Sequence, residues 1–309
     1  MLRAVPLFIL ALAAMSTVRP QDARPAPEID GRGAAAILAP GSTWTLLGEG
    51  YQLTADTAVD NSGTVFFTDA HRNRIMKIDS AGTIALWKEG SNDAHGIAFG
   101  PDGRLYAGQH DRKRIVALSP DGTESVITEG VQTHHLTVTV RNDVYYTQAP
   151  AHLVWLLKPD GSKRIVHQGL KWPRGVRAST TQPLLVVGDS QTPWIWSFQI
   201  GAGGSLLNAK QFCRLEGGSQ PDEIDAGGMS FDSEGFLYVA TKQGIQVCDP
   251  RGRVTAVLRP PAAGDLTNVF FGGPGLQWLY VTEMDKIYRR PATRRGVPLP
   301  VVPNRQLQR

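Results

Sequence analysis

The sequence contains few cysteines and few charged residues. Cys213 and Cys248 are its only cysteines among 309 residues. A domain of this size does not need disulfides for stability, so we expect two buried thiols rather than a bridge. Charged residues make up 19% of the chain, against about 25% in an average soluble domain. The net charge is +4, but the basic residues are scattered in twos and threes, which argues against a nucleic-acid-binding face.

Long hydrophobic runs are also lacking, except near the N-terminus. Residues 1–20 read MLRAVPLFILALAAMSTVRP, with one arginine, an apolar run from Ala4 to Met15 and then small residues. This order is typical of a secretory signal peptide, and the run is too short for a bilayer span of about 20 residues. The alternatives are a disordered apolar terminus or an uncleaved anchor. We expect export, a secreted or periplasmic location, cleavage between about Ala13 and Gln21, and no membrane span.

Six short apolar runs recur along the chain, each ending in a polar residue. Successive runs begin 40, 39, 41, 52 and 42 residues apart, at Val65, Leu105, Val144, Leu185, Leu237 and Leu279. Gly-containing turns such as GPDG and DSEG precede the runs, and further apolar strands follow them, which indicates hairpins. A period near 40 residues without helical spacing predicts an all-β fold, a six-bladed β-propeller with four-stranded blades. A two-sheet sandwich is the alternative, but regular spacing disfavours it.

The rest of the chain is assigned around this repeat. We expect a signal peptide at 1–20, a linker at 21–40, the propeller at 41–297 and a loosely held tail at 298–309. The segment near Trp44 to Leu47 should complete the last sheet. The long 52-residue interval contains an insertion that we interpret as an extended strand and a loop.

Polar side chains should converge at one mouth of the propeller. The first strand of each blade begins there, and the hairpin between the second and third strands opens there, which makes the mouth the expected ligand site. The first-strand positions are Ala55, His95, His134 (followed by His135), Arg174, Gly227 and Thr267. The hairpin positions are Asp69, Gln109 (followed by His110), Gln148, Asp189, Thr241 and Glu283. Isolated histidines such as His71 and His167 are given no role.

Two segments resemble a known family. TNVFFGGPGLQWLYVT, and GGMSFDSEGFLYVATKQGIQVCDPRGRV before it, are similar to the senescence marker protein/gluconolactonase/luciferin-regenerating-enzyme family, and the resemblance spans roughly residues 45–290. It implies a six-bladed propeller that hydrolyses sugar lactones. It also implies a divalent metal, often calcium or zinc, held at the mouth by a Glu in the first blade, Asn in the third and fourth, and Asp in the fifth.

This chain departs from that ligand pattern at every position. The four positions carry Ala55, His134, Arg174 and Gly227. Arginine offers only donors, and calcium requires six to eight oxygen ligands, so we expect the inherited site to be dismantled. Asp56 and Asp225, one residue late and two residues early, are the remaining candidate metal ligands.

Two functions of different classes remain open. The first is an exported lactonase-like hydrolase acting on a sugar lactone or related ester. His95 or His134 would serve as its acid or base, and Arg174 would stabilise the oxyanion. The second is a non-catalytic propeller that binds a small ligand or a protein.

The side chains at the mouth also predict the ligand's chemistry. A free Arg174 favours an anionic or lactone ligand, with His135, Asp69, Asp189 and Glu283 as further substrate-binding candidates. The competing interpretation is that Asp189 or Glu283 pairs with Arg174 and neutralises the pocket. Next to an arginine, the histidines should remain neutral near pH 7.

Overall fold

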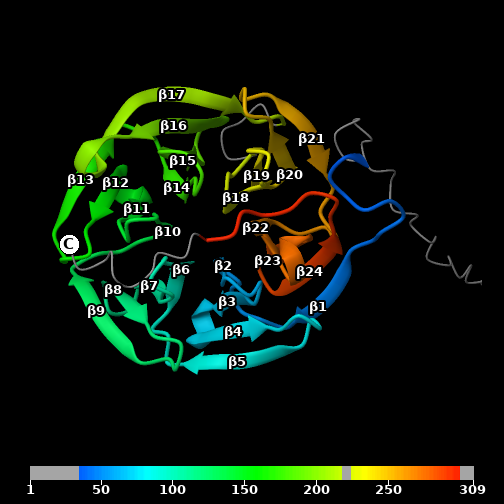
Figure 1. The fold of residues 1–309 in the computed structure, drawn as a ribbon, viewed down its shortest axis with the longest axis horizontal. Helices are drawn as coiled ribbons and strands as arrows, with labels where there is room; N and C mark the ends of the chain where they lie inside the picture. The colour runs from blue at the N-terminus through cyan, green and yellow to red at the C-terminus, as the bar shows by residue number, and fades with distance from the viewer. Residues whose placement is uncertain (1–34, 218–223, 300–309) are drawn as a thin grey trace, which may run out of the picture.

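The computed structural model describes residues 35–217 and 224–299. Six antiparallel four-stranded sheets are arranged in a ring around a central channel (Figure 1). The predicted six-bladed propeller is therefore confirmed.

Each blade begins with the strand that lines the channel and ends with the outermost strand. The first blade consists of β2 (Thr57–Val59), β3 (Val65–Asp69), β4 (Arg74–Ile78) and β5 (Ile84–Glu89). The second consists of β6 (Ala94–Phe99), β7 (Leu105–Gln109), β8 (Arg114–Leu118) and β9 (Glu124–Glu129). The third consists of β10 (Leu136–Val138), β11 (Val144–Gln148), β12 (Leu153–Leu157) and β13 (Lys163–Gln168).

The other three blades follow the same order. The fourth consists of β14 (Pro173–Ala178), β15 (Leu184–Asp189), β16 (Trp194–Ile200) and β17 (Leu206–Arg214). The fifth consists of β18 (Met229–Phe231), β19 (Leu237–Thr241), β20 (Gly244–Cys248) and β21 (Val254–Leu258). The sixth consists of β22 (Leu266–Gly272), β23 (Trp278–Glu283), β24 (Lys286–Pro291) and β1 (Thr45–Glu49).

The six apolar runs form the second strands of the blades. Every residue of β3, β7 and β19 is buried, and so is every residue of β23 except Trp278. The reason is that each blade is covered on both faces by its neighbours. The runs are therefore continuously apolar instead of alternating, as expected for strands covered on two sides. Their polar last residues lie at the mouth end of the blades and, apart from the partly exposed Gln148, are themselves buried.

The N-terminal strand closes the ring. β1 pairs antiparallel with β24, with Thr45 opposite Arg289 and Glu49 opposite Lys286. The expectation that the segment near Trp44 to Leu47 completes the last sheet is confirmed. With β1 in place the sixth blade has four strands like the others, and the edge of β24 is covered rather than open to edge-to-edge pairing.

The chain next to β1 is packed more tightly than a linker. Ile37 and Leu38 are only 2% and 4% exposed, within a core cluster of the fifth and sixth blades, and Leu38 forms a bridge with Ala292. The last residues of the predicted linker at 21–40 are thus packed against the ring, because burial of these two apolar side chains is favourable. The predicted signal peptide lies outside the described residues. In the described part of the chain, no helix is long and apolar enough to span a bilayer.

The C-terminal segment crosses the end of the channel opposite the mouth (Figure 1). Gly296 forms a bridge with Asp232, and its N–H donates to the Leu276 carbonyl at 2.9 Å. Arg294 makes an ion pair with Asp232 at 3.0 Å. The chain is thus fixed as far as the start of the predicted loose tail, of which residues 300–309 lie outside the described residues.

The two cysteines form a disulfide between adjacent blades. Cys213 in β17 is bonded to Cys248 in β20, with Cα atoms 6.4 Å apart, and both residues are fully buried. The expectation of unpaired thiols is therefore wrong. The insertion lengthens the outer strand of the fourth blade, which brings Cys213 against the fifth blade; the spacing of 35 residues along the sequence does not show this contact.

We predict that replacing both cysteines with alanine lowers the free energy of unfolding by about 3 kcal/mol, because the bridge restricts the unfolded chain. Urea unfolding followed by tryptophan fluorescence measures the change. The matched control is the wild type in reducing buffer, which should lose a similar amount. An unchanged unfolding midpoint in both samples would show that the bridge contributes nothing.

Candidate functional site

β-Bulges turn polar side chains toward the mouth at the starts of three inner strands. In β6 the pairing skips from Ala94 to Ile97, so His95 and Gly96 together oppose one residue. In β14 the pairing skips from Pro173 to Val176 in the same way, and β22 has a similar irregularity at Thr267. Bulges re-aim side chains beside active sites, and here they direct His95 and Arg174 out of the ladder.

His95 and Arg174 are each followed by a glycine, because a larger residue would clash at that position. A Cβ on Gly96 would lie 2.9 Å from the Leu136 nitrogen, and one on Gly175 would lie 2.1 Å from the Gly227 carbonyl oxygen. Both contacts are too close for a side chain. The backbone of each bulge therefore packs directly on the next blade, which fixes the neighbouring His95 and Arg174.

Four histidines gather on the mouth of the first three blades, and we call them the histidine cluster: His71, His95, His110 and His134. The rings of His95 and His110 are stacked, with centroids 3.9 Å apart and planes 3° apart. His134 lies edge-on to His110 at 5.8 Å, and His71 lies 6.3 Å from His95. The structure thus brings together the predicted His95 and His134.

The two predicted histidines are neutral over the physiological pH range. Burial lowers the pKa of His95 to about 4, with the neighbouring charge of His110 acting in the same direction. Burial likewise lowers the pKa of His134 to about 3, reinforced by the nearby His135 and Arg174. The expected neutrality is thus supported, but burial rather than the arginine is its main cause.

Arg174 has a carboxylate partner. Its Nη1 donates to Oδ1 of Asp225 at 2.6 Å, and both side chains are about 30% exposed. The expectation that Arg174 is free is therefore wrong. The sequence analysis considered Asp189 and Glu283 as competing partners, but the partner comes from the fifth blade, where Asp225 has a left-handed backbone (φ +44°).

Asp56 is used within the protein core. It is 5% exposed; its Oδ1 accepts from the Thr57 N–H and the Asn268 side chain, and its Oδ2 accepts from the Ile97 N–H. His135 Nδ1 lies 3.3 Å from Oδ2. These donors come from four blades and occupy both carboxylate oxygens, so Asp56 and His135 hold the centre of the ring together.

The predicted hairpin carboxylates mostly hold backbone and neighbouring side chains. Asp69 accepts from the Gln52 N–H at 2.8 Å and pairs with Arg74 at 2.6 Å. Asp189 accepts from the N–H groups of Lys171 and Trp172 at 2.9 and 2.8 Å. Their substrate-binding role stays a prediction.

Glu283 differs from the other hairpin carboxylates. Burial raises the pKa of its carboxyl group. Its Oε1 is buried and makes no hydrogen bond with any described residue.

A small cavity lies between the inner strands of the blades. It has a volume of about 20 Å³ and is lined by Asp56, His135 and Arg177, among others. Burial lowers the pKa of Arg177, while the charge of Asp56 acts in the opposite direction.

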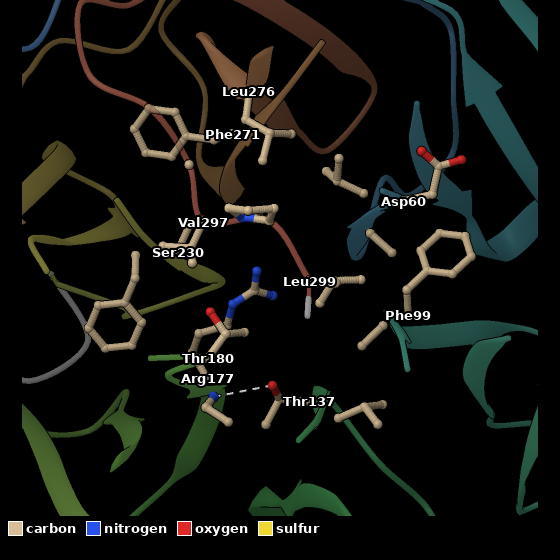
Figure 2. Close-up of a pocket in the computed structure, with 18 residues that line it drawn as sticks. Asp60, Phe99, Thr137, Arg177, Thr180, Ser230, Phe271, Leu276, Val297 and Leu299 are labelled. Carbon is tan, nitrogen blue, oxygen red and sulfur yellow. Dashed lines mark hydrogen bonds between the residues drawn. The ribbon is translucent and has the colours of Figure 1, made fainter. Parts of the chain in front are cut away.

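A second cavity of about 60 Å³ lies at the far end of the channel, between the inner strands and the C-terminal segment. Figure 2 shows the Arg177 guanidinium pointing into it, with Val297 and Leu299 alongside. Ligand pockets usually measure about 300–1,000 Å³, so this cavity is too small for a sugar lactone.

The sequence analysis missed two residues of the mouth, His71 and Asp93, and noted His110 only as the residue after Gln109. His71 is in η1 (Ala70–Arg72), at the hairpin of the first blade, although it was given no role. Asp93 and His110 flank His95, and the His95 Nε2 lies 3.3 Å from Asp93 Oδ2. Two signals were available. Asp93 lies two residues before His95, and His71 lies two residues after Asp69, the last residue of the apolar run in the first blade. Neither His71 nor Asp93 occupies one of the equivalent blade positions from which the site was predicted, which is why both were overlooked.

Comparison with known proteins agrees with the geometry. Residues 92–285 match the model of the SMP-30/Gluconolactonase/LRE-like region. The chain belongs to this family. A gluconolactonase of Zymomonas mobilis is 23% identical over 271 residues, which cover 75% of this chain and 76% of the relative.

Solved structures share the propeller fold. A gluconolactonase of Xanthomonas campestris superposes with a TM-score of 0.74 and 22% identity, over 89% of this chain and 99% of the relative. A protein of Agrobacterium tumefaciens described as calcium-binding regucalcin superposes with a TM-score of 0.69 and 14% identity, over 85% of this chain and 97% of the relative.

The inherited cation position in this chain does not fit calcium. Arg174 and Asp225 occupy it as an ion pair, and Asp56 has no free oxygen. A Cβ at Gly227 would lie 2.7 Å from the Thr267 carbonyl oxygen, so this backbone leaves no room for the carboxylate of the family pattern. Too few oxygen ligands remain for a cation that needs six to eight.

We predict that the protein loses stability as the pH falls from about 6.5 toward 3. In this window the unfolded chain binds a proton at His134 and the folded protein does not, so folding stability rises with pH. His134→Gln should reduce this slope by up to about 1.4 kcal/mol per pH unit. Urea unfolding at several pH values in chelator tests it, and an unaltered slope in the variant would refute it.

Proposed function

We propose that the protein is an exported lactonase-like hydrolase that acts on a sugar lactone or related ester at the propeller mouth. The observation that carries the proposal is the convergence of neutral His95 and His134 with Arg174 at the mouth. Membership of the gluconolactonase-like family supports hydrolysis as the reaction class.

The mouth supplies the groups that ester hydrolysis requires. Water attacks the carbonyl carbon of the lactone, a proton leaves the water, and the ring oxygen departs with a proton as the hydroxyl of the acid product. The neutral imidazole of His134 orients the water and accepts its proton. Arg174 stabilises the developing oxyanion with guanidinium donors other than the one that Asp225 accepts.

The ion pair changes the expected ligand. Asp225 offsets the positive charge of Arg174, so the mouth does not depend on a net negative charge in the substrate. We therefore favour a lactone recognised through its carbonyl and hydroxyl oxygens over an obligatory anion.

The replaced cation ligands favour a second candidate. A propeller that has lost the family's calcium ligands could bind a small molecule or a protein without turning it over. The Arg174–Asp225 pair supports this candidate, because it removes the Lewis acid of the inherited site.

Export is supported by the cysteines. The disulfide between Cys213 and Cys248 suits an oxidising compartment such as the periplasm or the extracellular space. Mass spectrometry of the protein from its native host should find an N-terminus between about Ala13 and Gln21. An intact Met1 on cytosolic protein would refute export.

Turnover of a panel of aldonolactones and aryl esters tests the proposed reaction. We predict acid release above the spontaneous rate, and we expect His134→Gln and Arg174→Gln each to lower kcat/KM by about 100-fold. A pH-indicator assay measures the acid. The matched control is His167→Gln, in the outer strand β13 and packed on Phe198, which should retain full activity.

The same assay separates the two candidates. A folded wild type that turns over no member of the panel, but binds one of them by calorimetry, would replace the hydrolase with the binding propeller. Turnover that persists in both mouth variants would place the chemistry elsewhere.

A further inference from the structure

We propose that His71, Asp93 and His95 form a site for a transition-metal ion, with zinc as the best fit, at the rim of the mouth between the first two blades. One ligand atom from each side chain lies within 4.8 Å of the other two. Zinc ligands at about 2.0–2.2 Å from a tetrahedral ion are separated by about 3.2–3.6 Å. The Asp93 Oδ2 to His95 Nε2 distance of 3.3 Å already meets this requirement.

Two polar atoms of this site are buried without a hydrogen bond. Asp93 Oδ1 and His95 Nε2 have no hydrogen-bond partner among the described residues, although buried polar atoms in proteins are normally satisfied. His95 Nε2 contacts Asp93 Oδ2 at 3.3 Å, which leaves Asp93 Oδ1 without a partner among the described residues. With the imidazole proton of His95 on Nδ1, Nε2 and the carboxylate can both bind a cation, and a bound cation would satisfy Oδ1 as well.

The loop that carries Asp93 is held from both sides. The Asp93 N–H donates to the Asn73 side-chain oxygen at 2.5 Å, and the Asp93 carbonyl accepts from the His110 N–H at 3.2 Å. Asp93 itself has a left-handed backbone with φ +52°, a conformation that aspartate adopts more readily than most residues. Contacts from both neighbouring blades thus fix the loop that carries the carboxylate beside His95.

Neighbouring residues also orient the ring of His95. It stacks on His110 at 3.9 Å, and His110 Nε2 donates to the Thr133 carbonyl at 2.5 Å. His71 is exposed on its hairpin and can adjust to complete the site. Two ligands are therefore held by their neighbours and the third is exposed, an arrangement that leaves the site open to an ion from solvent.

The ligand chemistry selects the metal. Two imidazoles and one carboxylate suit zinc and similar transition metals, whereas calcium takes oxygen ligands almost exclusively. Three protein ligands leave a fourth position open for water, as in catalytic zinc sites. These residues lie in the first and second blades, apart from the positions that carry Arg174 and Gly227.

Calorimetric titration of the tag-free protein with zinc chloride tests the site, and does so whether or not the protein is a hydrolase. We expect one equivalent of zinc to bind, and Asp93→Ala and His95→Gln each to weaken binding by about 100-fold. Asn73→Gly keeps the left-handed backbone but removes the oxygen that positions Asp93, and should weaken binding by about 10-fold. The control His167→Gln should bind as the wild type does.

X-ray absorption of the zinc-loaded wild type provides a readout that no variant's folding can affect. It should show two imidazole ligands and additional oxygen ligands. Failure of the wild type to bind zinc at 10-fold excess, or binding that is unchanged in Asp93→Ala, would overturn the proposal. Zinc binding without lactone turnover would leave the metal site standing and reject only the proposed hydrolase.

Discussion

A buried carboxylate at the centre of the ring, Asp56, is the group on which the mouth depends. Burying a charge without partners costs several kcal/mol, and Asp56 meets this cost by accepting hydrogen bonds from three blades and facing His135 from a fourth. Because the donors come from separate blades, the carboxylate fixes how the inner strands approach one another. It also leaves Asp56 no oxygen for a metal ion.

The other residues around the axis also differ from the family pattern of cation ligands. Arg174 and Asp225 form an ion pair at the position where the family pattern places cation ligands, and Gly227 packs on the Thr267 carbonyl. Polar groups with unused capacity lie instead toward the rim, in the histidine cluster and Asp93. In this chain the groups at the axis hold the ring together, and the rim of the first two blades carries two of the unsatisfied polar atoms, Asp93 Oδ1 and His95 Nε2.

The repeat spacing was sufficient to predict the blades, because a strand that is buried on both faces consists almost entirely of apolar residues and is easily found in the sequence. It also predicted the common mouth of His95 and His134. The pairing of Cys213 with Cys248 and of Arg174 with Asp225 could not be predicted, because each pair joins two adjacent blades and the repeat spacing does not show which of their side chains meet. His71 and Asp93 were missed because loops, and not strand register, bring them to His95.

The most direct measurement is a crystal structure of the protein grown with both calcium and zinc, with anomalous difference maps recorded at the zinc absorption edge. The account predicts a zinc peak bounded by His71, Asp93 and His95, and an intact Arg174–Asp225 ion pair with no cation beside it. A calcium ion held next to Asp225, with Arg174 displaced, would contradict it, and so would a zinc-free rim.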